Sequence, residues 1–299
     1  MSPGPGPAPG PATVADLCVA VYGGRDRTRA PLRAAFPKRR GRLVFVRTAS
    51  ELARVLRTEL VDAVVVELSA GSEDAWSAAA LARDFPTAPF LGAAPLRASE
   101  GSMLARCAAL GMADVLVEGV DDAALKALLA PTLFTVRFAS AFAEPPPALG
   151  LRDRLQLATW DRLVAAGGRL TRTSQLSAAL DVTREHLSRT FGCGAPSLKA
   201  VIDLVRVLAA GELARNPGHQ IRDVAEVLGF ATASHLARAT ARVAGCTPSA
   251  LAGTAAPAIL ARFAARHAGR VATGGEEGAG GHAGGERPPE SEARPAPST

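Results

Sequence analysis

The chain has 299 residues, of which 48% are hydrophobic and 21% charged, so it is long enough for two domains with buried cores. Only 4% of its residues are aromatic, which argues against binding single-stranded nucleic acid by rows of stacked aromatic side chains. The formal net charge of +6 is compatible with a polyanionic partner but does not require one.

The cysteines lie far apart and show no paired spacing typical of a metal site; they are Cys18, Cys107, Cys193 and Cys246. We therefore expect reduced thiols, no metal and no cofactor, in a cytoplasmic protein. The N-terminal sequence MSPGPGPAPGPA lacks the basic start and apolar core of an export signal. The longest uncharged stretch, residues 243–261, is interrupted by prolines, so we expect no membrane span and no membrane partner.

Changes in composition predict five segments along the chain. Residues 1–12 are Pro/Gly repeats expected to be disordered, residues 144–150 (EPPPALG) form a stiff proline-rich linker, and residues 254–299 form a mostly disordered tail. Between them lie an α/β domain at 13–143 and a helical domain at 151–253. The helical domain carries the positive excess, with 13 Lys or Arg against 8 Asp or Glu, whereas the α/β domain has 16 against 14.

In the first domain, short apolar runs alternate with amphipathic stretches. The apolar runs predict buried strands at 17–22, 43–46, 61–66, 89–92 and 115–117, and the amphipathic stretches predict helices at 27–36, 50–57, 75–85, 103–110 and 123–129. Five such βα units predict a parallel sheet with helices on both faces. Their size and rhythm resemble the receiver domain of two-component response regulators, which has a flavodoxin-like fold.

That resemblance implies phosphorylation chemistry at the ends of the strands, and most of it is missing here. Asp26 is the only acidic residue near the end of the first strand, and the third strand ends in Glu67 rather than aspartate. The fourth strand ends in Gly92-Ala93-Ala94, without a hydroxyl, and the fifth in Val117-Glu118, without a lysine. Since phosphoryl transfer needs Mg²⁺ ligands and cations, we expect no phosphorylation and a structural role for Glu67.

A glycine pair, Gly23-Gly24, follows the first strand. It is too short for a dinucleotide or P-loop fingerprint, both of which need more glycines at fixed offsets. We interpret it as a tight strand–helix turn.

The second domain contains an internal repeat. The segment Thr183–Arg189 (TREHLSR) recurs 49 residues later as Thr232–Arg238 (TASHLAR). Each copy follows a short apolar helix and a tight turn, and the leading threonine is suited to cap the next helix. This pattern predicts two helix–turn–helix units.

A linking helix of about 20 residues is predicted between the two units, over Ser197–Asn216. The second unit also has a Gly229-Phe230 pair and a Gly245-x-x-Pro248 element. With these motifs, residues 151–252 resemble the DNA-binding domain of AraC/XylS-type transcription regulators. The chain departs from the family at Thr240 and Ala244, where members usually carry aromatic residues, and this predicts a looser core in the second unit.

Helical spacing and the resemblance assign the same outward faces to base contact. The candidate DNA-binding residues are Arg184, Glu185, Ser188 and Arg189 in the first recognition helix and Ala233, Ser234, Ala237 and Arg238 in the second.

Simpler interpretations stay open for several of these groups and their neighbours. The arginines among the candidates could be solvated helix charges or contact phosphate rather than bases. His186 and His235 are expected to pack or to bond the backbone rather than to bind a ligand, Cys193 and Cys246 to behave as small buried hydrophobes, and Lys38–Arg42 to form a solvated loop.

The sequence thus predicts a non-enzymatic regulator with double-stranded DNA as its partner. RNA polymerase and a second copy of the chain are further partners consistent with the resemblance. Two alternatives stay open at this stage: a response regulator phosphorylated on Asp26 or Glu67, and a protein-interaction module whose repeats no longer bind DNA.

Overall fold

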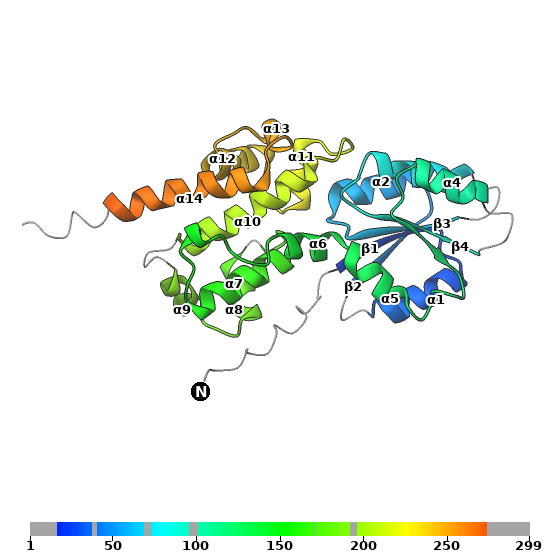
Figure 1. The fold of residues 1–299 in the computed structure, drawn as a ribbon, viewed down its shortest axis with the longest axis horizontal. Helices are drawn as coiled ribbons and strands as arrows, with labels where there is room; N and C mark the ends of the chain where they lie inside the picture. Colours follow the sequence, from blue (N-terminus) through cyan, green and yellow to red (C-terminus); the bar gives the residue numbers. More distant parts are fainter. Residues whose placement is uncertain are drawn as a thin grey trace, which may run out of the picture.

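The computed structural model describes residues 17–37, 41–68, 73–95, 101–170, 172–191 and 196–273. It contains a parallel-sheet domain followed by a helical domain (Figure 1). The segments expected to be disordered at 1–12 and beyond 273, together with Lys38–Arg40 and Cys193, lie outside the described residues.

The first domain is built on five parallel strands in the order β2-β1-β3-β4-β5. Their bounds are β1 Leu17–Tyr22, β2 Gly41–Val46, β3 Ala63–Glu67, β4 Phe90–Ala94 and β5 Asp114–Val117. The central strands β1 and β3 are buried along their whole length, as expected of uninterrupted apolar runs in a sheet covered on both faces. This strand order confirms the flavodoxin-like fold expected from the sequence.

Helices cover both faces of the sheet (Figure 1). On one face α1 (Asp26–Ala35) and α5 (Leu125–Leu129) pack against alternate residues of the strands, among them Val19 and Val65. On the other face lie α2 Ala49–Thr58, α3 Glu73–Ala80 and α4 Gly101–Ala109, which cover the remaining alternate residues. The two faces have separate cores because successive side chains of a strand point in opposite directions.

The second domain is entirely helical. Its helices are α6 Phe134–Ala141, α7 Arg154–Ala165, α8 Thr173–Ala179, α9 Arg184–Thr190, α10 Leu198–Leu213, α11 Ile221–Val227, α12 Ala233–Ala244, α13 Pro248–Leu251 and α14 Ala256–Thr273. Helix α10 runs through the centre and buries almost every one of its side chains, because apolar residues occupy nearly its whole circumference (Figure 1).

The boundary between the domains differs from the expected one at residue 143. Phe134, Phe138 and Phe142, each four residues apart, belong to the core of the helical domain rather than to the sheet domain. The indole N–H of Trp160 in α7 donates to the carbonyl of Phe142 (2.8 Å). Leu149 is also buried in this core, so the expected linker at 144–150 is attached to the helical domain at that residue.

The expected tail from residue 254 is also different, because α14 occupies Ala256–Thr273. Ile259 and Phe263 in this helix are buried in the same core as α10 and α12. The disorder prediction rested on the average composition of the whole segment, and that average does not show a short stretch of apolar residues at helical spacing.

The linking helix α10 is shorter than the sequence pattern predicted. It ends at Leu213 rather than Asn216, and its 16 residues span about 24 Å instead of about 30 Å. Pro217 disfavours a helical conformation at Asn216, which explains the earlier end.

Candidate nucleic-acid interface

The first recognition helix, α9, presents the face that the sequence predicted. The Thr183 hydroxyl accepts a hydrogen bond from the backbone N–H of His186 (3.1 Å) and caps the helix. Leu187 and Phe191 point into the core. The side chains on the opposite face are all exposed, namely Arg184, Glu185, Ser188 and Arg189.

Helix α7 holds α9 in place through one buried amide. The side-chain N–H of Gln156 donates to the carbonyl of Thr190 (2.7 Å), while its oxygen accepts from the backbone N–H of Arg152 (2.9 Å). A shallow groove of about 680 Å³ follows this junction and is lined by Arg152, His186 and Arg189. Arg152 is not among the residues predicted from the sequence, because its local pattern shows only that it precedes a helix cap.

The turns of the two units share one backbone geometry. Asp181 has φ +53° and Gly229 has φ +65°, both in the left-handed region. The following backbone N–H then bonds a carbonyl five residues back, Val182 to Ser177 (3.0 Å) and Phe230 to Ala225 (2.8 Å). Glycine adopts this conformation without strain, and aspartate is among the few other residues that tolerate it. The repeat in sequence is therefore a repeat in structure.

The second recognition helix, α12, is capped in the same way. The Thr232 hydroxyl accepts from the backbone N–H of His235 (3.1 Å), and Leu236 is buried. Of the predicted contact residues, Ala233, Ser234 and Arg238 are exposed and Ala237 is half-buried.

The two histidines of the repeat have different surroundings. His235 packs edge-on against Phe230, with ring centroids 5.5 Å apart, as expected. The side chain of His186 is exposed beside Arg189, so it does not pack as that of His235 does. The apolar ring of Phe230 has no counterpart in the first turn, where the smaller Val182 follows Asp181.

Two charged residues of α10 anchor the second unit. The Arg206 guanidinium lies 3.6 Å from the ring centre of Phe230 and donates to the carbonyl of Leu228 (2.9 Å). Burial lowers the pKa of Arg206, and the neighbouring Asp203 carboxylate opposes that shift. Asp203 in turn accepts from Arg242 of α12 (2.7 Å). These contacts fix both the turn and the recognition helix to α10.

Helix α14 completes the packing of α12. Arg266 and Arg262 donate to the carbonyls of Ala241 (2.8 Å) and Ala244 (3.1 Å) in the last turn of α12, where cations are favourable. Phe263 and Val243 line the same cavity of about 450 Å³. The core of the second unit was expected to be looser because α12 lacks two aromatic residues. An aromatic side chain from α14 contributes to that core instead.

The end of β3 in the sheet domain is occupied by contacts within the chain. The buried Glu67 carboxylate accepts from the backbone N–H groups of Gly24 (2.6 Å) and Arg25 (2.8 Å) and pairs with the Arg25 guanidinium. This is the local hydrogen bonding expected for Glu67. Asp26 is exposed at the start of α1, and Glu118 accepts weakly from the Thr28 hydroxyl (3.3 Å).

Comparison with protein families identifies the repeat region. Residues 176–253 match the model of a family described as "Helix-turn-helix domain". This segment is an AraC-type helix–turn–helix domain. The match runs from α8 to the end of α13, and it includes both recognition helices. Domains of this type bind DNA in transcription regulators. The sheet domain and α14 lie outside the matched residues of the AraC-type domain.

Two further comparisons concern the whole chain. Full-length FixJ from B. japonicum is 10% identical, with a TM-score of 0.34 over 75% of this chain and 95% of that one. The comparison with curated proteins finds no significant match.

Within the part of the chain that the structure describes, no cluster of three or more His, Cys, Asp or Glu residues could hold a metal ion. None of the described helices is long and apolar enough to cross a membrane.

Proposed function

We propose that the chain is a sequence-specific, double-stranded DNA-binding transcription regulator of AraC type, and that its receiver-like domain acts without phosphorylation. The observation that carries this proposal is the pair of threonine-capped helices, α9 and α12, which turn the predicted contact residues outward; α9 is held by α7 and α12 by α10. The proposed activity is binding rather than catalysis, and its location is that of the DNA, the cytoplasm.

The polar groups of α9 are suited to reading base edges in the major groove. Arg189 can donate two hydrogen bonds to guanine, and Glu185 can accept one from the cytosine amino group. Arg152, in the groove beside them, is placed to contact phosphate. On the outward face of α12 Arg238 has comparable reach, whereas Ala233 and Ala237 can touch a thymine methyl group.

The same arrangement allows one chain to cover an asymmetric DNA site. Because α10 lies between the two units in the chain, both recognition helices belong to one polypeptide and need no second copy to be brought together. Successive major-groove segments on one side of a duplex lie about 34 Å apart.

The absence of phosphorylation is inferred from the contacts of Glu67. Two backbone N–H groups and one guanidinium already bind its carboxylate, and an aspartate, a hydroxyl and a lysine are missing from the strand ends. A carboxylate saturated in this way is a poor nucleophile toward a phosphoryl donor.

The direct test is selection of binding sites by the full chain from a pool of random duplex DNA, followed by a salt series on the selected site. If about 6 phosphates are contacted, affinity should fall roughly 10³-fold between 50 and 200 mM salt. The double variant Arg189→Ala, Arg238→Ala is the control, because it should fold but enrich no motif. A wild-type chain that enriches no motif would overturn the proposal and favour the protein-interaction alternative.

A further inference from the structure

The sheet domain contacts the helical domain through several hydrogen bonds, including one from Arg137 of α6 to the carbonyl of Thr87, and two of these contacts lie next to the helix–turn–helix units. One lies just before α8, at the base of the first helix–turn–helix unit, and the other just before α11, at the base of the second. Helix α10 joins the same two units directly (Figure 1). The sheet domain is therefore a second connection between the two recognition helices.

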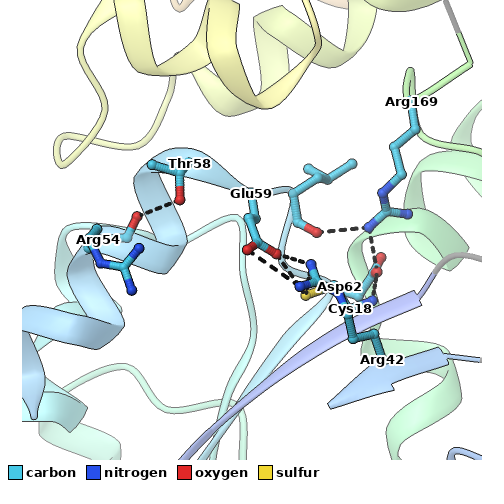
Figure 2. A network of polar contacts seen from close by, with 8 residues as sticks. Cys18, Arg42, Arg54, Thr58, Glu59, Asp62 and Arg169 are labelled. Atoms are coloured by element: carbon cyan, nitrogen blue, oxygen red, sulfur yellow. Dashed lines mark hydrogen bonds and ion pairs between the residues drawn. The ribbon is translucent and has the colours of Figure 1, made fainter. Parts of the chain in front are cut away.

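The first attachment centres on Asp62, at the start of β3. Its carboxylate is fully buried and accepts from the backbone N–H of Cys18 (2.8 Å) and from the hydroxyl (2.7 Å) and N–H (3.1 Å) of Thr135. Arg169, from the segment between α7 and α8, donates to Asp62 (2.7 Å) and to the carbonyl of Leu60 (2.8 Å) (Figure 2). Leu60 itself belongs to the core of the helical domain.

The Arg169–Asp62 pair is protected from water. Asp62 is completely buried and the Arg169 side chain is 18% exposed, so removal of the arginine would leave a buried carboxylate with a lost charge partner. The nearby pair Arg42–Glu59 lies within the sheet domain and is much more exposed (Figure 2). It provides an ion pair for comparison that does not join the two domains.

The second attachment is the loop between α10 and α11. Asn216 exchanges two hydrogen bonds with Thr87, accepting from its N–H (3.0 Å) and donating to its hydroxyl (2.7 Å). The backbone N–H of Gly218 donates to the carbonyl of Asp84 (2.8 Å). The Nε2 atom of His219 lies 2.8 Å from the carbonyl of Leu56 at the end of α2.

The contact at Gly218 leaves no room for a side chain. A Cβ atom there would lie 2.6 Å from Cζ of Phe85, whose ring is fully buried and packs edge-on against His219 at 5.1 Å between ring centres. The backbone of Gly218 is outside the left-handed region, so alanine would act as a steric wedge without imposing backbone strain.

From these contacts we infer that the sheet domain positions the two recognition helices relative to each other, with Arg169 and the Asn216–His219 loop as the positioning groups. The inference rests on the proposed DNA-binding function. Two bodies joined by one helix can still twist and bend about it, whereas a second attachment on each side removes that freedom. The attachment at Asp62 is buried and the one at Asn216 partly buried, and both are polar, so their geometry is specific.

The first test measures this geometry without DNA. Spectroscopic labels are introduced through unnatural amino acids at positions 188 and 234, and their distance distribution is recorded in the full chain. We expect one narrow peak for the wild type and a broadened or shifted peak for Arg169→Ala and for Gly218→Ala. Arg42→Ala and Gly253→Ala are the controls, since a Cβ at Gly253 meets nothing closer than 3.9 Å.

Each variant is first checked for a cooperative unfolding transition. If Arg169→Ala does not fold, Arg169→Lys and Thr87→Ala are milder changes at the two attachments, judged by the same criterion. A folded variant carrying changes at both attachments and showing the wild-type distance distribution would overturn the inference.

The second test uses the selected DNA site with about 5 base pairs inserted between its halves, which turns the second half to the opposite side of the duplex. Wild-type affinity should fall roughly tenfold or more, and the fall should shrink for Arg169→Ala and Gly218→Ala but not for the controls. Equal losses for variants and wild type would contradict positioning by the sheet domain. A wild-type chain with no selected site would contradict the proposed function, while the distance measurement would still decide the inference.

Discussion

Asp62 and Glu67 lie at opposite ends of strand β3, about 16 Å apart along the chain, and each carboxylate binds an arginine from a different part of the protein. Asp62 binds Arg169 of the helical domain, whereas Glu67 binds Arg25 of the sheet domain itself. The connection to the recognition helices is therefore at the end of the sheet remote from the position where receiver domains are phosphorylated. The strand end at Glu67 is closed by local contacts.

The contacts of Glu67 predict that phosphoryl donors do not phosphorylate the chain. Incubation with acetyl phosphate and Mg²⁺ should leave the intact mass and the DNA affinity unchanged. Glu67→Gln should lower the free energy of unfolding by about 1.5–3 kcal/mol, because hydrogen bonds to a charged group are lost, as measured by denaturant titration. The control Glu118→Gln should have a smaller effect, since its one contact is weak. A stoichiometric acyl phosphate on Glu67 or Asp26 would refute this prediction.

Helix α14 should be required for the stability of the second unit. A chain ending at Thr254 should unfold at lower denaturant concentration and bind DNA more weakly than one ending at Thr273, which keeps the helix. Phe263→Ala alone should cost about 3–5 kcal/mol, the usual range for a fully buried phenylalanine. Equal stability of the two shortened chains would show that α14 does not support α12.

The core of α12 contains one polar atom that should be dispensable. Thr240 is fully buried, and its hydroxyl has no hydrogen-bond partner among the described residues. Thr240→Val keeps the shape and removes the unsatisfied hydroxyl, so it should raise the free energy of unfolding by about 1 kcal/mol. The matched control is Thr159→Val in α7, because the Thr159 hydroxyl is equally buried but donates to Leu155 (2.6 Å). The control should be neutral or destabilised; stabilisation of both variants would contradict the explanation.

The two recognition helices should contribute unequally to sequence discrimination. Arg189→Ala should weaken binding to the selected site by about 1–3 kcal/mol and relax the motif in the first half-site. Arg238→Ala should weaken binding while changing the motif less, because the other groups on that face of α12 are short. Motifs selected by each variant from a random duplex pool would measure the difference. If Arg238→Ala removes as much sequence information as Arg189→Ala, the two helices read bases comparably.

Cys18 in β1 should make stability depend on pH in the alkaline range. Burial raises the pKa of its thiol to about 11, with Glu59 and Asp62 adding to the shift and Arg42 opposing it. Folding thus favours the neutral thiol. The contribution of this thiol to the free energy of unfolding is constant below the pKa of about 8.5 in the unfolded chain, and it decreases as the pH rises from there to about 11. Over that interval, the unfolding free energy of the wild type should fall about 2–3 kcal/mol more than that of Cys18→Ala. Parallel pH profiles for the two proteins would contradict the raised pKa.

The sequence alone predicted the elements whose signal is local. All five strands and their helices followed from apolar periodicity, and the two helix–turn–helix units followed from a repeat with threonine caps. The outward faces of α9 and α12 followed from the position of one buried leucine in each, because a helix with one buried side exposes the other. The capping hydroxyls and the role of Glu67 as a local acceptor depend on residues close in sequence or at adjacent strand ends.

The remaining features depend on contacts between segments that are far apart in the chain. Composition assigned Phe134–Phe142 to the sheet domain and α14 to a tail, because a short apolar helix carries no mark of the core it will join. The roles of Arg169 and Gly218 could not be predicted from their neighbours in the sequence. An arginine and a glycine in loops have such a role only because the fold places Asp62 and Phe85 against them. The relation between the two domains lies in such pairs, more than 100 residues apart in the chain, and local patterns contain no information on that scale.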